Sequence, residues 1–151
     1  MECLLMKKQQ GFTFIEVLTV LAIIALATIG TLAVRDWAVG NSRVSDAKNQ
    51  VVTIQAGAQL WRPRSGDFTG ISLASMSAIA AVPETWGDGT SINPWGGNIN
   101  VEADAADSSR YVVTLSGIAQ DGEGARLARD FTDYTVDSSY SAGTLTLRFQ
   151  G

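Results

Sequence analysis

The feature that most constrains this chain is a long apolar segment near its N-terminus. Residues 12–34 read FTFIEVLTVLAIIALATIGTLAV, in which Glu16 is the only charged residue. The 18 residues from Val17 to Val34 carry no charge, and as an α-helix they would be about 27 Å long. Because that length is close to the thickness of the hydrocarbon core of a bilayer, the segment is predicted to be a transmembrane helix.

Lys7 and Lys8 precede the apolar segment. Because basic residues tend to stay in the cytoplasm, we expect a cytoplasmic N-terminus. Residues from about 40 onward should then lie outside the bacterial inner membrane, on its periplasmic side. An ordinary signal peptide is one alternative, but it would have a shorter apolar core and a small-residue cleavage site, which Gly30-Thr31-Leu32-Ala33 matches weakly. An uncleaved plain anchor is another.

Glu16 needs an explanation of its own, because a carboxylate within a membrane helix costs about 2.5–3.5 kcal/mol on insertion scales. No Lys or Arg lies one helical turn away on its C-terminal side. Glu16 is therefore either solvated at the level of the lipid headgroups or paired with a positive charge that arrives from elsewhere.

The composition excludes several functional classes. The chain has 151 residues, no His and one Cys, which removes Ser-His and Cys-His catalysis, His-ligated metal sites and an internal disulfide. Its formal charge is −4, which argues against nucleic acid as a direct partner. We expect a protein that is not an enzyme and that has no catalytic residues, no cofactor and no metal.

An amphipathic pattern follows the apolar segment. Apolar residues recur at spacings of three and four, as on one face of a helix. They are Val44, Ala47, Val51, Ile54, Ala58 and Trp61. Pro63 disfavours helical backbone at Arg62. The sequence therefore predicts one long helix over about residues 13–61, apolar nearly all round in its first half and one-sided in its second.

The remainder of the chain has a mixed pattern. A helix is predicted from Leu73 to about Ala81 with Ser72 as its N-cap, and another over about 123–131. Alternating apolar residues predict four strands. These are Asn98–Ala103, Arg110–Ile118, Tyr134–Asp137 and Thr144–Phe149. The expected fold is α+β, with the long helix packed on an antiparallel sheet of about four strands.

The sequence Gly11-Phe12-Thr13-Phe14-Ile15-Glu16, followed by an apolar helix, resembles the class III signal of type IV pilin precursors. The resemblance implies that a prepilin peptidase cleaves between Gly11 and Phe12 and methylates the new amine of Phe12. Lys7 and Lys8 would belong to the basic leader. Glu16 would become the fifth residue of the mature chain and pair with the Phe12 ammonium of a neighbouring subunit, which would set the register of assembly.

The same resemblance implies a domain organisation and a set of partners. Residues 1–11 would be a cleaved leader, 12–35 the transmembrane and assembly half of the helix, 36–62 its amphipathic half and 63–151 a β-rich head. The implied partners are other copies in a helical homopolymer, the prepilin peptidase, an inner-membrane platform protein, an assembly ATPase and an outer-membrane secretin. The chain would pass from the inner membrane into an extracellular pilus serving adhesion, conjugation or motility.

The branch of the family is left open by two features. Asn93-Pro94-Trp95-Gly96-Gly97 is similar to the type IVb pilins of thin conjugative pili, whereas the short leader is as in type IVa pilins. Cys3 is the only cysteine and lies in the leader, so the C-terminal region would be held by packing and hydrogen bonds, or by neighbouring subunits.

Two further functions remain as alternatives. The first is a pseudopilin of a type II secretion system, a class whose major members resemble pilins and bind Ca²⁺. The second is an uncleaved membrane-anchored domain. Acidic residues that could bind a hard cation are Glu102, Asp104, Asp107, Asp130, Asp133 and Asp137. Their spacing does not match an EF-hand loop, and we expect solvated polar loops there.

Overall fold

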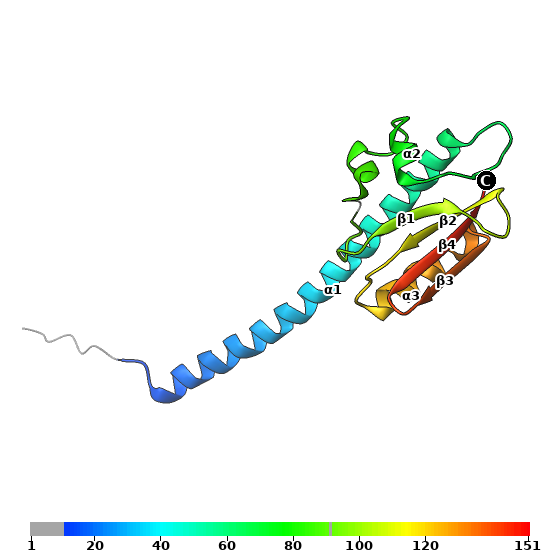
Figure 1. Ribbon diagram of the computed structural model, residues 1–151. Coiled ribbons are helices and arrows are strands. Elements are labelled where there is room, and N and C mark those ends of the chain that lie inside the picture. Colours follow the sequence, from blue (N-terminus) through cyan, green and yellow to red (C-terminus); the bar gives the residue numbers. More distant parts are fainter. Residues whose placement is uncertain (1–10, 91) are drawn as a thin grey trace, which may run out of the picture. The chain divides into compact units, whose positions relative to one another are not determined.

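The computed structural model describes residues 11–90 and 92–151 (Figure 1). The chain divides into two compact units, one up to Val39 and the other Gly40–Gly151. The predicted leader residues Lys7 and Lys8 lie outside the described residues.

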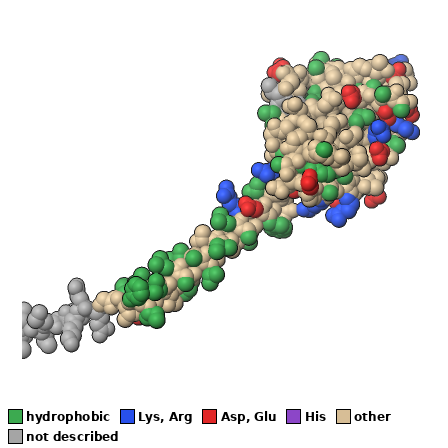
Figure 2. All heavy atoms as spheres, turned by 60° about the horizontal axis from the view of Figure 1, so that its bottom comes forward, with side chains coloured by type: hydrophobic (Ala, Val, Ile, Leu, Met, Phe, Trp, Pro, Cys, Tyr) green, Lys and Arg blue, Asp and Glu red, His purple; other side chains and the backbone are tan. Residues whose placement is uncertain are grey.

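Helix α1, Phe14–Trp61, is the long helix that the sequence predicts. In the first unit its side chains are exposed, from Phe14 to Val39. This helix contains an 18-residue window with a mean hydropathy of 2.6, none of it buried, and so has the length and composition to cross a membrane. Figure 2 shows apolar side chains covering this part of the helix.

The second unit contains the other half of α1, which is one-sided. Its buried residues are Gly40, Val44, Ala47, Val51, Ile54, Gly57 and Ala58. Trp61 is partly buried against the same core. The amphipathic pattern predicted from the sequence is therefore confirmed, and the helix ends ahead of Pro63, as expected.

A four-stranded antiparallel sheet completes the core, with the strand order β1-β2-β4-β3. The strands are β1 (Ile99–Ala103), β2 (Arg110–Leu115), β3 (Asp137–Ser141) and β4 (Thr144–Gln150). The central pair places Val113 opposite Leu147. Both of these side chains are fully buried. The α+β class and the four antiparallel strands agree with the sequence-based prediction.

Helix α3, Asp121–Phe131, packs beside the second half of α1. The Lys48 ammonium on α1 lies 2.6 Å from a carboxylate oxygen of Asp130. The Ser138 hydroxyl on β3 donates to the Ala128 carbonyl at 2.6 Å. Because Ser138 pairs with the buried Leu147 in the sheet register, α3 lies on the core face of the sheet, as α1 does. The second unit is thus a layer of helices on one face of a sheet.

Two shorter elements connect α1 to the sheet. Helix α2, Leu73–Ser77, has a capping box in which the side chains of Ser72 and Ser75 each accept from the other residue's backbone N–H. The predicted N-cap Ser72 is therefore confirmed, but the helix is shorter than predicted. The chain leaves it through Ala80, which has a φ of 55°. A wide turn, η1 (Trp86–Thr90), follows.

The strand predicted at Tyr134–Asp137 is wrong. Thr132–Tyr134 forms a helical turn, η2, and the strand that follows is β3. β3 has the sequence DSSYS, which lacks the apolar alternation that the prediction used. It is an edge strand that pairs on one side with β4, so its position is set by that pairing more than by its own pattern.

Aromatic stacking and main-chain hydrogen bonds hold the C-terminal strand. The ring of Phe149 on β4 lies 5.3 Å from that of Tyr111, which lies 5.0 Å from the ring of Phe68. Burial raises the pKa of the Tyr111 phenol. The Gly151 N–H donates to the Ser109 carbonyl at 3.1 Å.

Candidate processing and assembly site

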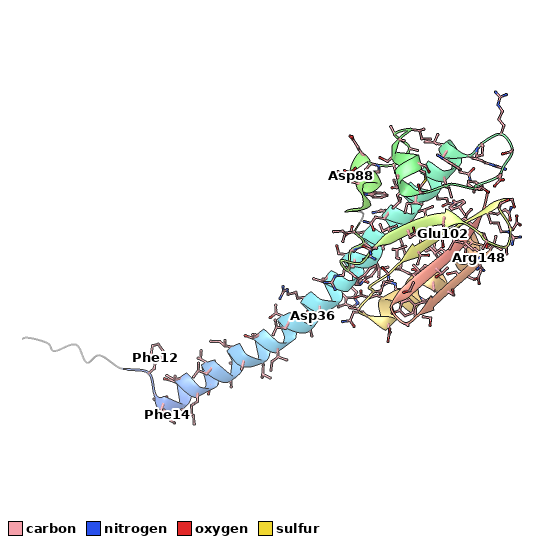
Figure 3. The ribbon with its side chains drawn as sticks, in the orientation of Figure 1. Phe12, Phe14, Asp36, Asp88, Glu102 and Arg148 are labelled. Atoms are coloured by element: carbon pink, nitrogen blue, oxygen red, sulfur yellow. The ribbon has the colours of Figure 1, made fainter. Side chains whose placement is uncertain are left out.

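The predicted cleavage site lies in an open segment just before α1. Gly11, Phe12 and Thr13 are outside the helix, and the space where a Cβ of Gly11 would lie is empty to at least 4 Å. Phe12 is 89% exposed (Figure 3). The Gly11–Phe12 bond therefore lies outside the helix and next to an exposed side chain.

Glu16 closes a capping box at the start of α1. The Thr13 backbone N–H donates to Glu16 Oε2 at 2.8 Å, and the Glu16 backbone N–H donates to the Thr13 hydroxyl at 3.3 Å. The pattern Thr-x-x-Glu before an apolar run is a known signature of a helix start. This local partner differs from the two environments expected for Glu16, solvation or an external charge, although the Thr-x-x-Glu pattern indicates it.

The capping box does not neutralise Glu16. An amide donor satisfies one carboxylate oxygen but leaves the negative charge in place, at the positive end of the helix dipole. The ion pairs recorded in the described part of the chain do not involve Glu16. Its second oxygen, Oε1, is therefore suited to accept a hydrogen bond from a cation.

The polar side chains within the apolar segment are satisfied locally. The hydroxyl of Thr19 donates to the Ile15 carbonyl at 2.7 Å, and that of Thr28 to the Ile24 carbonyl at 2.8 Å. Such bonds to the preceding turn remove the cost of placing a hydroxyl in an apolar environment. Apart from Glu16, this helical surface can therefore be covered by lipid or by other apolar helices.

The Asn93-Pro94-Trp95-Gly96-Gly97 segment forms a structural turn. The buried Asn93 donates through its side-chain amide to the Ser116 carbonyl at 2.6 Å, and its Oδ1 accepts from the backbone N–H groups of Trp95 and Gly97. The Trp95 indole N–H donates to Glu123 on α3. Trp95 is also packed against the core. The segment holds the chain before β1 against the sheet and α3.

Four of the six acidic residues considered as cation ligands, Asp104, Asp107, Asp130 and Asp137, form ion pairs. Arg148 lies between two of them, with Nε 3.2 Å from Asp104 and Nη1 3.3 Å from Asp137. Asp104 is only 7% exposed. Figure 3 shows Arg148 and Glu102 on the sheet, where both belong to one row of paired residues across the strands. In residues 11–90 and 92–151 no three carboxylate, His or Cys side chains gather into a set that could hold a metal ion.

Two other acidic residues have pKa values shifted by local partners. Hydrogen bonds from the side chain and backbone of Ser109 lower the pKa of Asp107, as does the charge of Arg110. The hydrogen bond from Lys48, together with the charges of Lys48, Arg129 and Arg126, lowers the pKa of Asp130. Both carboxylates are therefore engaged within the fold.

Comparison with known proteins identifies the N-terminal region. A family model described as the prokaryotic N-terminal methylation motif matches residues 6–32. No curated protein and no solved structure matches the chain. The matched region contains the open Gly11–Phe12 bond, the Thr13–Glu16 capping box and most of the uncharged helix.

Residues 6–32 therefore carry a type IV pilin-like prepilin signal. The long N-terminal helix followed by a four-stranded antiparallel sheet matches the pilin fold. Together they support a type IV pilin-like or pseudopilin-like prepilin, and the motif implies processing by a prepilin peptidase and pilus-type assembly machinery in general. The apolar helix fits membrane anchoring before assembly.

Proposed function

We propose that this chain is a structural subunit of a type IV pilus. In this proposal a prepilin peptidase cleaves after Gly11 and methylates Phe12, and the mature chain polymerises through the first half of α1. The observation that carries the proposal is the coincidence of the methylation motif with an exposed apolar helix whose first turn contains Glu16.

An exposed apolar helix needs a partner outside its own chain. Ile23, Leu26 and Ile29 are each more than 60% exposed, and burial is worth about 1.5–3 kcal/mol for each such side chain. Lipid would supply that burial while the chain waits in the inner membrane. Apolar helices of other copies would supply it in a filament.

The charge of Glu16 can determine how adjacent subunits dock in a filament. Cleavage would create an ammonium on Phe12, and methylation keeps that charge. Glu16 Oε2 stays occupied by the Thr13 N–H, which remains an amide after cleavage, whereas Oε1 can accept from the Phe12 ammonium of a neighbour. Removing the partner of a buried charge is costly, so the pair would fix the axial register of adjacent subunits.

The proposed route requires the partners that the resemblance implies. The N-terminus would face the cytoplasm, where the peptidase acts, and residues 63–151 would form the head on the other side of the inner membrane. A platform protein and an ATPase would extract the subunit, and a secretin would pass the filament to the cell surface. A processed subunit that stays in the envelope would instead be a pseudopilin.

Glu16 substitutions test the register pairing apart from the capping box. Gln also closes a capping box, so Glu16→Gln keeps the start of the helix and removes the charge. Thr13→Ala removes the hydroxyl acceptor and keeps the charge. We expect normal cleavage in both, filaments reduced at least tenfold in Glu16→Gln, and near-normal filaments in Thr13→Ala, measured by electron microscopy and by the pilin content of sheared fractions.

Glu16→Ala removes both the charge and the cap, and should be processed but form few or no filaments. Normal filaments in Glu16→Gln would reject the pairing. A loss of filaments in Thr13→Ala equal to that in Glu16→Gln would show that the helix start, and not the charge, is what assembly requires.

A further inference from the structure

The uncharged apolar segment ends abruptly at Arg35-Asp36-Trp37. All three side chains are exposed, and Trp37 is 71% exposed. Figure 3 labels Asp36 on α1, where it projects away from the helix. A large aromatic side chain beside two charged residues, none of them covered by the described part of the chain, is a combination that needs an external environment with both apolar and polar parts.

The distance between the two ends of the segment matches a bilayer. Glu16 and Trp37 lie on one continuous helix, so the 21-residue separation corresponds to about 31 Å along the axis. The hydrocarbon core of a bilayer is about 30 Å thick. When Glu16 lies at one boundary of the hydrocarbon, Trp37 lies at the other.

We propose that Arg35 and Trp37 form an anchor in the lipid headgroup region on the side of the membrane opposite Glu16. Tryptophan favours this boundary because its ring is apolar and its indole N–H needs a polar partner. The Cα–Cβ bond of a helical residue tilts toward the N-terminus, which directs the Trp37 ring back toward the hydrocarbon. The Arg35 guanidinium can form charge-assisted hydrogen bonds to lipid phosphate.

The two ends of the segment differ in how firmly they hold the helix in the membrane, because their side chains point in different directions relative to the hydrocarbon. At the N-terminal end the same tilt directs Glu16 outward, toward the backbone N–H of Thr13, which it contacts. A carboxylate that points out of the membrane holds the helix weakly, because it is solvated over a range of depths. The anchor therefore sets the depth of the helix, and it keeps Glu16 and the Gly11–Phe12 bond at the opposite surface.

This inference rests on the membrane-inserted stage of the proposed function, and not on cleavage or on the filament. The test uses the full chain in phosphatidylcholine vesicles whose acyl chains carry bromine either near the headgroup or near the bilayer centre. Bromine quenches tryptophan fluorescence at short range. Trp61, Trp86 and Trp95 lie in the second unit and pack against its core.

We expect headgroup-proximal bromine to quench up to about a quarter of the total emission, since Trp37 is one of four tryptophans. Centre-proximal bromine should quench less. Trp37→Phe should abolish the lipid-dependent quenching, and the matched control Trp61→Phe, on the same helix, should retain it. Arg35→Leu lengthens the apolar run, and should shift the quenching of Trp37 toward the centre-proximal bromine.

If the chain floats with the vesicles, three results would contradict the proposed anchor. They are no quenching by either lipid, stronger quenching by the centre-proximal bromine in the unsubstituted chain, or quenching that survives Trp37→Phe. A chain that does not float with the vesicles at all would instead reject the membrane-inserted stage of the proposed function. The two failures are therefore distinguishable.

Discussion

Helix α1 combines two halves of the same secondary structure with opposite surroundings. Up to Val39 its apolar side chains are exposed, whereas from Gly40 onward one face is buried in the core of the second unit. The sequence marks the change, because the first half is apolar all round and the second is apolar on one face. An apolar surface with no partner among residues 11–90 and 92–151 is evidence for lipid or for a second copy.

The small residues of the helix show the same difference. A Cβ on Gly57 would lie 2.7 Å from a Val82 methyl carbon and 2.9 Å from the Ala81 carbonyl oxygen. A Cβ on Gly30 would meet nothing within 4 Å. The first glycine permits a close contact inside the fold, whereas the second makes no such contact with the residues that the structure describes.

The largest difference in the free energy of unfolding is expected between substitutions of two isoleucines on α1. Ile54 is fully buried, whereas Ile24 is 54% exposed. Ile54→Ala should lower the free energy of unfolding of the second unit by about 2–5 kcal/mol, because it leaves a cavity. Ile24→Ala should leave that energy unchanged. Denaturant unfolding of the full chain in detergent measures both, and similar losses in the two variants would break the comparison.

Glycine substitutions should give a smaller difference. Gly57→Ala should destabilise the second unit by about 1–3 kcal/mol, because its methyl group overlaps Val82 and the Ala81 backbone. Gly30→Ala should leave the unfolding midpoint of the second unit unchanged and add helical stability of up to about 1 kcal/mol to the first half of α1. Thermal unfolding and circular dichroism distinguish the two. An unchanged midpoint in Gly57→Ala would contradict the close contact seen at this position.

The smallest effect concerns the contact of α1 with α3. The hydrogen bond from Lys48 lowers the pKa of Asp130 below its usual value of 3.8. Because the folded state favours the ionised carboxylate, the pair stabilises the fold above about pH 3.8, and this contribution is lost as the pH falls through the lower folded pKa. Asp130→Asn and Lys48→Met should each cost about 0.5–1 kcal/mol at pH 7.

The two substitutions should also be non-additive, since each removes the same pair. The acid-induced loss of stability should become less steep in Asp130→Asn. Unfolding measured between pH 7 and pH 3 on the single and double variants checks both statements. Additive losses would show that the two side chains act separately.

The sequence predicted best those elements whose pattern is local. The long helix, its buried face, the N-cap Ser72 and three of the four strands follow from periodicity and capping residues, and the structure confirms them. The Thr13–Glu16 capping box is also local, and the Thr-x-x-Glu pattern is sufficient to indicate it.

The features that the sequence could not predict depend on contacts between distant segments. Strand β3 is placed by β4, and by the bond from Ser138 to α3. Gly40 is buried where a Cβ would meet the side chain of Glu123, and that same carboxylate accepts from Trp95. Nothing in the local sequence of these residues indicates their partners.

The N-terminus and intact mass of the protein test the central claim most directly, that the exposed half of α1 belongs to a processed filament subunit. They should be measured in envelope and in sheared-surface fractions of cells with a working prepilin peptidase. We predict a chain that begins at methylated Phe12 and is present in the sheared fraction. A processed chain confined to the envelope would assign the protein to the pseudopilins. A chain that still begins at Met1 in both fractions would contradict the account.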